Sequence, residues 1–200
     1  MHRRFIISVD IGQTNEYTAI TVIEEIRDLR GGKFFHVGHI ERMEAGTTYH
    51  TIIQRINELR DRPEFKQCIV HVVVDLTAVG KPVWELLEKQ CLGCVITGVF
   101  ITGGDSVTEE ERCIFRVPKR DLITSLQLVL QGNALVIAEG LPEGDAFRSG
   151  LASYGEKKVS LNMHGHVENW REGANDGIVL SVAIGVWDGV RGKPFDLMDW

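Results

Sequence analysis

The segment FIISVDIGQTNEYTAITVI, residues 5–23, decides the fold of this chain, because it predicts the first two strands of a sheet with an acidic residue between them. Residues 5–12 predict a buried β-strand, and residues 17–27, rich in Thr, Ile and Val, predict a second strand after a short polar turn. Asp10 lies at the edge of the first apolar run. A carboxylate beside buried apolar sequence is costly unless a partner stabilises it, and a divalent cation is a common partner.

Two more acidic residues stand at the edges of apolar runs far along the chain. Asp75 ends CIVHVVVD (residues 68–75), and Asp176 opens DGIVLSVAIGVW (residues 176–187). The first strand and the strand that ends at Asp75 are expected to lie side by side, with both carboxylates at one edge of the sheet, where open α/β sheets place their ligands. Asp176 at a helix start completes the cluster from the side. Together with Asp10, these carboxylates predict one oxygen-rich metal centre.

The predicted donors are carboxylates and waters, which suit Mg²⁺ or Mn²⁺ rather than zinc. Two such ions, about 3.5–4 Å apart, activate a water and stabilise the leaving oxygen when a phosphodiester is hydrolysed. Cys91-Leu-Gly-Cys94 has the spacing of half a zinc site, but no second pair completes it. The cysteines are therefore predicted to be small core residues.

The rest of the chain predicts alternating strands and helices without an internal repeat. The first three strands have short connections and predict an antiparallel meander. The polar, acidic segment 102–115 predicts a mobile loop or lid, and residues 157–168 predict a hairpin that turns near His164. The fold class is thus α/β, with a mixed sheet flanked by helices. The further expected elements are strands over 33–42, 67–75, 94–101 and 134–138, and helices over 47–60, 82–90, 118–131, 143–154 and 176–187.

Composition limits the class of protein. The chain has 200 residues, 44% of them hydrophobic, which is enough to bury the core of a single domain over residues 1–200. No apolar run approaches the roughly 18 residues of a membrane helix, and the start lacks the features of a signal peptide, which predicts a cytoplasmic protein. A net charge of −6 argues against a strong general affinity for nucleic acid. A nuclease this acidic is expected to bind DNA weakly alone and to depend on partner domains.

Four segments together resemble the nuclease domain of the large terminase subunit of tailed bacteriophages. They are DIGQTNEYTAI (10–20), VVVDLTAVGKPVWELL (72–87), VPKRDLITSLQLVLQ (117–131) and NDGIVLSVAIG (175–185). The resemblance runs over nearly the whole chain in the right order. It implies a ribonuclease H-like fold and a metal-dependent DNA endonuclease that cuts concatemeric viral DNA during genome packaging in the host cytoplasm.

Carried over residue by residue, the resemblance implies that Asp10, Asp75 and Asp176 are catalytic and bind the metal, with two ions expected. The family often has a second Asp six residues after the first, where this chain has Glu16, whose longer carboxylate is a further candidate ligand. The family often has two adjacent Asp residues in its last motif, where this chain reads Asp176-Gly177. Binding of the second ion is therefore expected to depend on Glu16, water or a DNA phosphate.

The resemblance also implies partners, namely double-stranded DNA, an ATPase domain, a portal protein and the small terminase subunit. Residues 78–82, Ala-Val-Gly-Lys-Pro, resemble the end of a phosphate-binding loop but lack the earlier Gly and the Ser or Thr after the Lys, so this chain has no ATPase motif. Its start, almost directly on the first strand, is expected of a domain excised from a longer protein. A naturally short chain is the alternative.

Five basic or imidazole side chains are candidates for DNA contact. Lys119 and Arg120 open a predicted helix, where basic residues oppose the helix dipole, so contact with a phosphate is one explanation for them. Lys157, Lys158 and His164 lie on the predicted hairpin, and the resembled family has a comparable hairpin near its active site. A solvated helix face and a plain exposed turn are the alternatives.

Three other functions stay open from the sequence. A Holliday-junction resolvase or transposase-like enzyme with the same fold would prefer four-way junctions to linear duplex. The sugar-kinase and actin-like ATP-binding fold has a similar first phosphate loop, but this chain has Gln13 before Thr14 and is short for a two-domain ATP cleft. A non-catalytic module that docks on a portal or another packaging partner would bind no metal.

Overall fold

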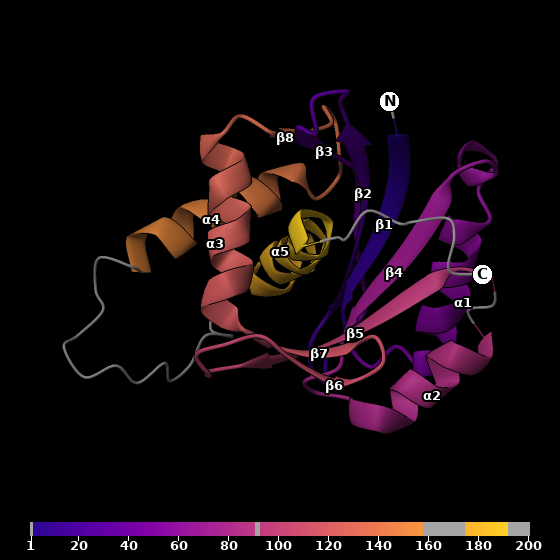
Figure 1. The fold of residues 1–200 in the computed structure, drawn as a ribbon. Coiled ribbons are helices and arrows are strands. Elements are labelled where there is room, and N and C mark those ends of the chain that lie inside the picture. The colour runs from indigo at the N-terminus through magenta and orange to yellow at the C-terminus, as the bar shows by residue number, and fades with distance from the viewer. Residues whose placement is uncertain (1, 91–92, 158–174, 192–200) are drawn as a thin grey trace.

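The computed structural model describes residues 2–90, 93–157 and 175–191, which form one mixed β-sheet with helices on both faces (Figure 1). The strands are β1 (His2–Asp10), β2 (Thr18–Arg27), β3 (Lys33–Met43), β4 (Ile69–Asp75), β5 (Val95–Thr102), β6 (Thr108–Glu111), β7 (Ile114–Pro118) and β8 (Leu135–Ile137). They lie in the order β6-β7-β5-β4-β1-β2-β3-β8 across the sheet.

The sheet combines the predicted meander with a parallel half. β1, β2 and β3 pair antiparallel, as the sequence predicts. On its other side β1 pairs parallel with β4, and β5 and β7 continue the parallel arrangement. β6 is an antiparallel edge strand on β7, and β8 pairs parallel with β3 at the opposite edge. Four parallel strands, β1, β4, β5 and β7, therefore end at one edge of the sheet.

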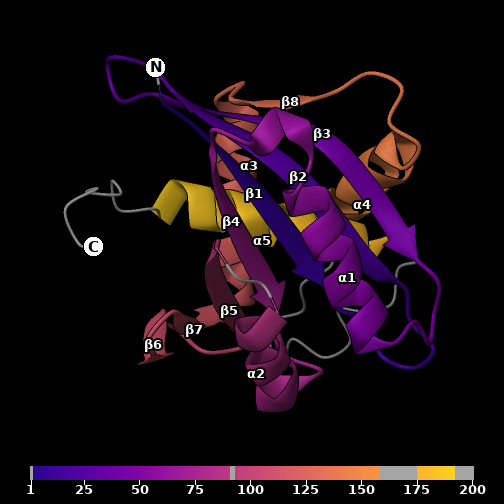
Figure 2. The same cartoon turned by 90° about the vertical axis from the view of Figure 1, so that its right-hand side faces the viewer.

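In the part of the chain that the structure describes, five α-helices cover the two faces of the sheet. Helices α3, α4 and α5 cover one face, and α1 and α2 cover the other (Figures 1 and 2). A buried stripe at helical spacing holds α1 on the sheet, and Oγ1 of Thr48 caps it by accepting a hydrogen bond from N of Thr51 at 3.3 Å. The bounds are α1 (Tyr49–Arg60), α2 (Gly80–Gln90), α3 (Lys119–Gln131), α4 (Gly144–Lys157) and α5 (Asp176–Arg191), with a 3₁₀ turn at Pro63–Phe65.

Helix α5 lies at the centre of the fold, between the sheet and α3 (Figure 1). Its sequence is apolar all round, and most of its residues are buried, as expected for a core helix. Glycines let it approach β1 closely. A methyl group at Gly185 would lie 2.9 Å from Cβ of Ser8, and one at Gly189 would lie 2.3 Å from Cε1 of Phe35. This close packing brings the start of α5 to the end of β1.

The prediction of a mobile loop or lid over residues 102–115 is wrong for most of the segment. Residues 103–107 form a connection after β5, but residues 108–111 form β6 and residues 114–115 begin β7. Ile114 and Phe115 are buried, and β7 pairs with β5 inside the sheet. β6 is exposed along its whole length, so its sequence has no apolar residue to indicate a strand. Ion pairs stabilise the hairpin, from Arg116 to Glu110 at 3.0 Å and from Lys81 to Glu111.

The other predicted elements are confirmed within a few residues of their expected bounds. The helix expected over 143–154 is α4, and the short strand expected over 134–138 is β8. The hairpin expected over 157–168 falls outside the described residues, except for Lys157, which ends α4. Cys68, Cys94 and Cys113 are free thiols and half-buried. Among the described residues, no helix has the length and apolar character to cross a membrane.

Candidate metal centre

Asp10 and Asp75 end adjacent parallel strands and are direct neighbours in the sheet. The register pairs them as Cα partners, on strands that lie about 4.8 Å apart. Register partners point to the same face, and here it is the face that α5 covers. Both side chains are buried, with exposures of 5% and 2%. The prediction that these acids meet at one sheet edge is confirmed.

Asp176 reaches the same place from the start of α5. A methyl group at Gly177 would lie only 2.9 Å from Oδ2 of Asp10, so the first turn of α5 lies directly against that carboxylate. Asp176 is 5% exposed and is the acidic residue of the first helical turn. The partial positive charge of a helix N-terminus attracts anionic groups, so the first turn of α5 is a favourable place for an acidic residue.

A cavity of about 280 Å³ opens beside Asp10 and Asp176. Asp10, Asp176 and Glu16 line it, together with the basic side chain of Arg42. Its other lining residues come from the β1–β2 turn, β2 and the first turns of α5, namely Gly12, Asn15, Tyr17, Ala19, Gly177, Ile178 and Leu180. The cavity therefore offers three carboxylates and one cation at the carboxyl edge of the sheet.

Asp75 faces its own turn rather than this cavity. Its Oδ1 accepts hydrogen bonds from N of Thr77 at 2.8 Å and from Oγ1 of Thr77. The same hydroxyl oxygen accepts from N of Ile101 at 2.8 Å, which fixes the turn to β5. Asp75 thus stabilises the turn between β4 and α2. This role does not conflict with metal binding through its other oxygen.

The three acids match a hard cation by chemistry, but as placed their side chains do not form a complete set of metal ligands. Carboxylate oxygens are the preferred ligands of Mg²⁺ and Mn²⁺. Among the residues that the structure describes, no three His, Cys, Asp or Glu side chains are placed to hold a metal. Asp10 adjoins Asp75 through the strand register and Asp176 through the cavity, so it is the common neighbour of both.

Glu16 is brought to the cavity by a tight turn after β1. A methyl group at Gly12 would lie 2.5 Å from the carbonyl oxygen of Glu16, so only glycine fits there. N of Gly12 donates to Oγ1 of Thr18 at 3.1 Å, and Oε2 of Glu16 accepts from N of Gln13 at 3.2 Å. The carboxylate is therefore held at the rim of the cavity, within the turn that links the first two strands.

Arg42 is the residue of the cavity that the sequence interpretation missed. The register links Asp10 to Ala19 and Ala19 to Arg42, so Arg42 lies two strands from Asp10 on the same face. Its guanidinium donates to Oε2 of Glu143 and to Oδ1 of Asn175. The sequence signal for Arg42 was its place two residues after the apolar Ile40, near the end of a predicted strand, which puts both side chains on one face of the sheet.

Two of the five DNA-contact candidates lie at the same sheet edge, but away from the cavity. Lys119 and Arg120 directly follow β7, three strands and so about 14 Å across the sheet from β1. Arg120 is exposed and pairs with Asp105 at 2.9 Å. Lys157 is the last residue of α4, while Lys158 and His164 lie outside the described residues.

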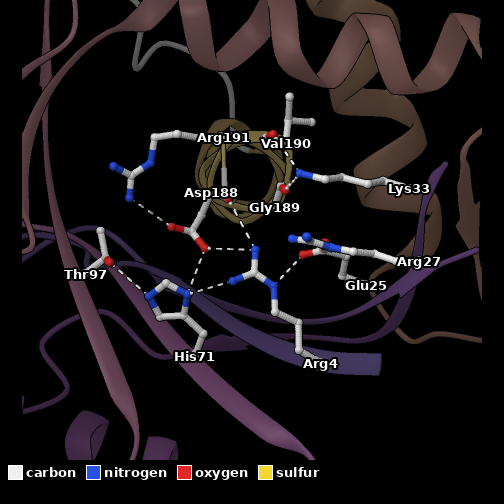
Figure 3. A network of polar contacts seen from close by, with 10 residues as sticks. All are labelled: Arg4, Glu25, Arg27, Lys33, His71, Thr97, Asp188, Gly189, Val190 and Arg191. Carbon is white, nitrogen blue, oxygen red and sulfur yellow. Dashed lines mark hydrogen bonds and ion pairs between the residues drawn. The ribbon is translucent and has the colours of Figure 1, made fainter. Parts of the chain in front are cut away.

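A second group of charged residues lies buried at the opposite end of β1 and α5 (Figure 3). Nδ1 of His71 lies 2.9 Å from Oδ2 of Asp188, and Nε2 of His71 lies 2.9 Å from Oγ1 of Thr97. Arg4 pairs with Glu25 and lies 3.6 Å from Asp188. None of these five side chains belongs to a residue more than 8% exposed, so we interpret the cluster as structural. The sequence interpretation did not identify it.

Charge attraction within this buried cluster outweighs the cost of burial at Asp188. Burial alone would raise the pKa of Asp188, but His71, Arg4 and Arg191 lower the pKa below its ordinary value. On the far side of α5 from Asp188, Nζ of Lys33 donates to the carbonyl oxygen of Gly189 at 2.7 Å (Figure 3). This lysine satisfies an end carbonyl of the helix.

Comparison with solved structures finds a similar fold in the nuclease domain of a viral terminase. The chain is similar to the Mn-soaked terminase nuclease domain of human cytomegalovirus, with 8% identity, a TM-score of 0.50, and coverage of 94% of this chain and 84% of that one. No protein-family model and no curated protein sequence matches the chain. This likeness shows that the chain has the ribonuclease H-like fold of terminase nuclease domains, as the sequence resemblance implied.

Two further solved structures are similar over most of their length. The large terminase nuclease domain of bacteriophage SPP1, with bound Mn, is 9% identical, with a TM-score of 0.49 and coverage of 91% of this chain and 84% of that one. RuvC of Thermus thermophilus is 12% identical, with a TM-score of 0.45 and coverage of 92% and 91%.

Proposed function

We propose that this chain is a metal-dependent DNA endonuclease, with Asp10, Asp75 and Asp176 as its metal ligands. The observation that carries the proposal is the position of Asp10, which neighbours Asp75 in the sheet register and meets the start of α5 beside Asp176. Three carboxylates from separate parts of the chain thus converge at the carboxyl edge of a ribonuclease H-like sheet. The shared fold with a terminase nuclease domain supports the same activity.

Each residue of the centre has a proposed role in phosphodiester hydrolysis. Mg²⁺ or Mn²⁺, when bound, would supply activation of a water and stabilisation of the leaving oxygen, and two ions suit this chemistry. Asp10 would hold the shared position, because it adjoins both other acids. Asp75 would bind one ion and Asp176 the other. Glu16, at the rim of the cavity, would orient a water or serve as a further ligand of the second ion. Lys119 and Arg120 would contact DNA phosphates farther along the sheet edge.

The finer proposal is a terminase nuclease that cuts concatemeric viral DNA during genome packaging. It is supported by the four sequence segments that resemble that family and by the shared fold. In that role the chain would act with an ATPase domain, a portal protein and a small terminase subunit, in the cytoplasm of the host cell. Weak sequence preference is expected, because no base-reading motif is present in the sequence.

Plasmid cleavage in the presence of Mn²⁺ or Mg²⁺ tests the activity. Asp10→Asn, Asp75→Asn and Asp176→Asn are each expected to lower the cleavage rate more than about 100-fold, beyond the 10- to 100-fold typical of residues that only support a ligand. Asp145→Asn is the matched control, because the Asp145 side chain is fully exposed at the start of α4. Undiminished cutting by the three variants would refute the assignment.

Substrate comparison separates the alternatives. Faster cutting of four-way junctions than of linear duplex would favour the resolvase function, since one RuvC structure holds a Holliday junction substrate. Saturable ATP binding would favour the kinase-like function. Absence of Mn²⁺ binding in calorimetry would favour a docking module without activity.

A further inference from the structure

Arg42, at the end of β3, holds together the residues that precede two helices. Its Nε and Nη2 donate to Oε2 of Glu143 at 3.0 and 2.8 Å, and Nη2 donates to Oδ1 of Asn175 at 3.0 Å. Glu143 comes directly before α4 and Asn175 directly before α5. Their carbonyl oxygens accept from N of Phe147 at 2.9 Å and from N of Val179 at 3.2 Å. One guanidinium therefore fixes the starts of both helices to one strand.

The start of α5 is also held by α4. A methyl group at Gly150 would lie 3.2 Å from Cβ of Asn175, so the backbone of α4 packs closely against the residue before α5. The next two residues are Asp176, whose carboxylate lines the cavity, and Gly177, whose backbone lies against Asp10. A shift of Asn175 would therefore move Asp176 relative to Asp10.

Arg42 is also part of the cavity wall. It lines the cavity with Asp10 and Asp176, and its side chain is 22% exposed. The register places it two strands, or about 10 Å, from Asp10. A cation at this distance from the acids influences any metal ion there both by its charge and by the contacts that it makes.

We propose that Arg42 is a positioning residue of the metal centre. Through Asn175 and Glu143 it sets the start of α5, and so the place of the Asp176 carboxylate relative to Asp10. The inference rests on the proposed function, because it concerns the carboxylates that are assigned to the metal there. Arg42 touches neither metal nor substrate in this role.

Positioning and charge predict opposite effects of removing Arg42. Like charges repel, so an Arg42 that acted only by its charge would weaken metal binding, and Arg42→Ala would tighten it. If Arg42 positions Asp176, the start of α5 loses its tie to β3 in Arg42→Ala and metal affinity falls. Residues that orient metal ligands typically account for about 10- to 100-fold in affinity. The sign of the change therefore distinguishes the two roles.

The test measures Mn²⁺ affinity of the full chain without DNA by isothermal titration calorimetry. Arg42→Ala is expected to bind Mn²⁺ about 10- to 100-fold more weakly than the wild type, and Asn175→Ala is expected to weaken binding in the same direction. In the double variant the two effects are expected to be less than additive, because both remove one interaction. Near-ultraviolet circular dichroism checks the fold, and Asn175→Ala serves as the readout if Arg42→Ala does not fold.

Arg55→Ala is the matched control. Nε of Arg55 lies 2.8 Å from Oε1 of Glu41, a pair with side-chain exposures of 32% and 20%, against 22% and 27% for Arg42 and Glu143. Glu41 precedes Arg42 on β3 and points to the opposite face of the sheet. The control therefore removes a similar ion pair from the same strand, away from the cavity, and is expected to keep its Mn²⁺ affinity within about twofold.

The outcomes separate this inference from the proposed function. Unchanged or tighter binding by Arg42→Ala, with wild-type binding that Asp10→Asn abolishes, overturns the inference alone. An equal loss in Arg55→Ala shows a general effect of lost ion pairs and also overturns it. A wild-type chain with no measurable Mn²⁺ affinity overturns the proposed function and the inference together.

Discussion

Removal of the Asp188 side chain is predicted to destabilise the fold strongly while leaving the candidate metal centre unchanged. Oδ2 of Asp188 lies 2.9 Å from Nδ1 of His71 and 3.6 Å from Nη2 of Arg4, and Oδ1 lies 3.4 Å from Nη2 of Arg191 (Figure 3). Asp188 is 1% exposed, so water does not replace these contacts in the folded chain. Asp188→Ala would leave His71 and Arg4 buried beside a cavity.

The expected loss of stability depends on which contacts His71, Arg4 and Arg191 keep when the Asp188 carboxylate is removed. Removing one partner of a buried ion pair typically costs about 3–5 kcal/mol, because the other charge stays buried. Arg4 keeps its ion pair with Glu25, and the side chain of Arg191 is 33% exposed and can be hydrated. The loss is therefore expected near the lower end, about 3 kcal/mol. This is a large part of the roughly 5–15 kcal/mol that stabilises a typical domain.

The contribution of Asp188 should depend on pH in one direction. Its pKa in the folded chain lies below the ordinary value of 3.8. A carboxyl group with a lowered pKa stabilises the fold above its unfolded-state pKa, and this contribution is lost as the pH falls through the folded-state pKa. The stability difference between wild type and Asp188→Asn, which removes the charge at nearly constant shape, is expected to be full at neutral pH and to shrink only below about pH 4.

Urea unfolding followed by tryptophan fluorescence measures these differences, because Trp84 and Trp187 are buried. A loss below about 1 kcal/mol in Asp188→Ala, the size of an average substitution, would refute the reasoning that this cluster carries stability. Arg4 precedes Asp10 by six residues of β1, or about 20 Å, so Mn²⁺ affinity should stay unchanged. A large fall in that affinity would contradict the separation of the two sites.

Three further predictions concern the cavity and the opposite face of the sheet. Gly177→Ala places a methyl group 2.9 Å from Oδ2 of Asp10, so we expect that carboxylate to shift. Calorimetry should then show about tenfold weaker Mn²⁺ binding. The free energy of unfolding should change by less than about 1 kcal/mol. Glu16→Gln is expected to lower the cleavage rate less than Asp10→Asn does, because Glu16 sits at the rim; an equal loss would make it a full ligand. Burial raises the pKa of Glu41, but His39 and Arg55 lower it by more, to about 2 from the ordinary 4.5. Arg55→Ala should therefore lower the free energy of unfolding in urea by about 1 kcal/mol at neutral pH, after allowance for the partial exposure of the pair. The difference from wild type should be small once the pH has fallen to about 2.

The sequence predicts those strands and helices whose buried residues form a recognisable pattern within one short segment. β4 is a continuous apolar run, and α5 is apolar all round, which is the pattern of a core helix. Because strands that end at the same edge deliver their last residues together, the meeting of Asp10 and Asp75 also follows from sequence. The orientation of Asp75 toward Thr77 does not, since it depends on how one turn packs against β5.

The remaining features depend on contacts between distant residues. β6 is exposed along its length, so its pairing with β7 leaves no hydrophobic pattern to detect. Arg42 meets residues 101 and 133 positions away, and its sequence neighbours give no sign of either. Arg4 and Asp188 each look like solvated charges near the end of an element, and only the packing of α5 on β1 buries them together.

The position of α5 also affects how the chain can fold as it is made. The face of the sheet formed by β1, β2 and β3 is covered by residues 176–191, which are synthesised long after those strands. Until then Ile6, Ile23 and Phe35 lack the helix that packs on β1, β2 and β3, although each is at most 1% exposed in the finished fold. Contacts this far apart in sequence slow folding and leave apolar surface open to association. Chains interrupted before α5 are therefore expected to be substrates for chaperones and proteases.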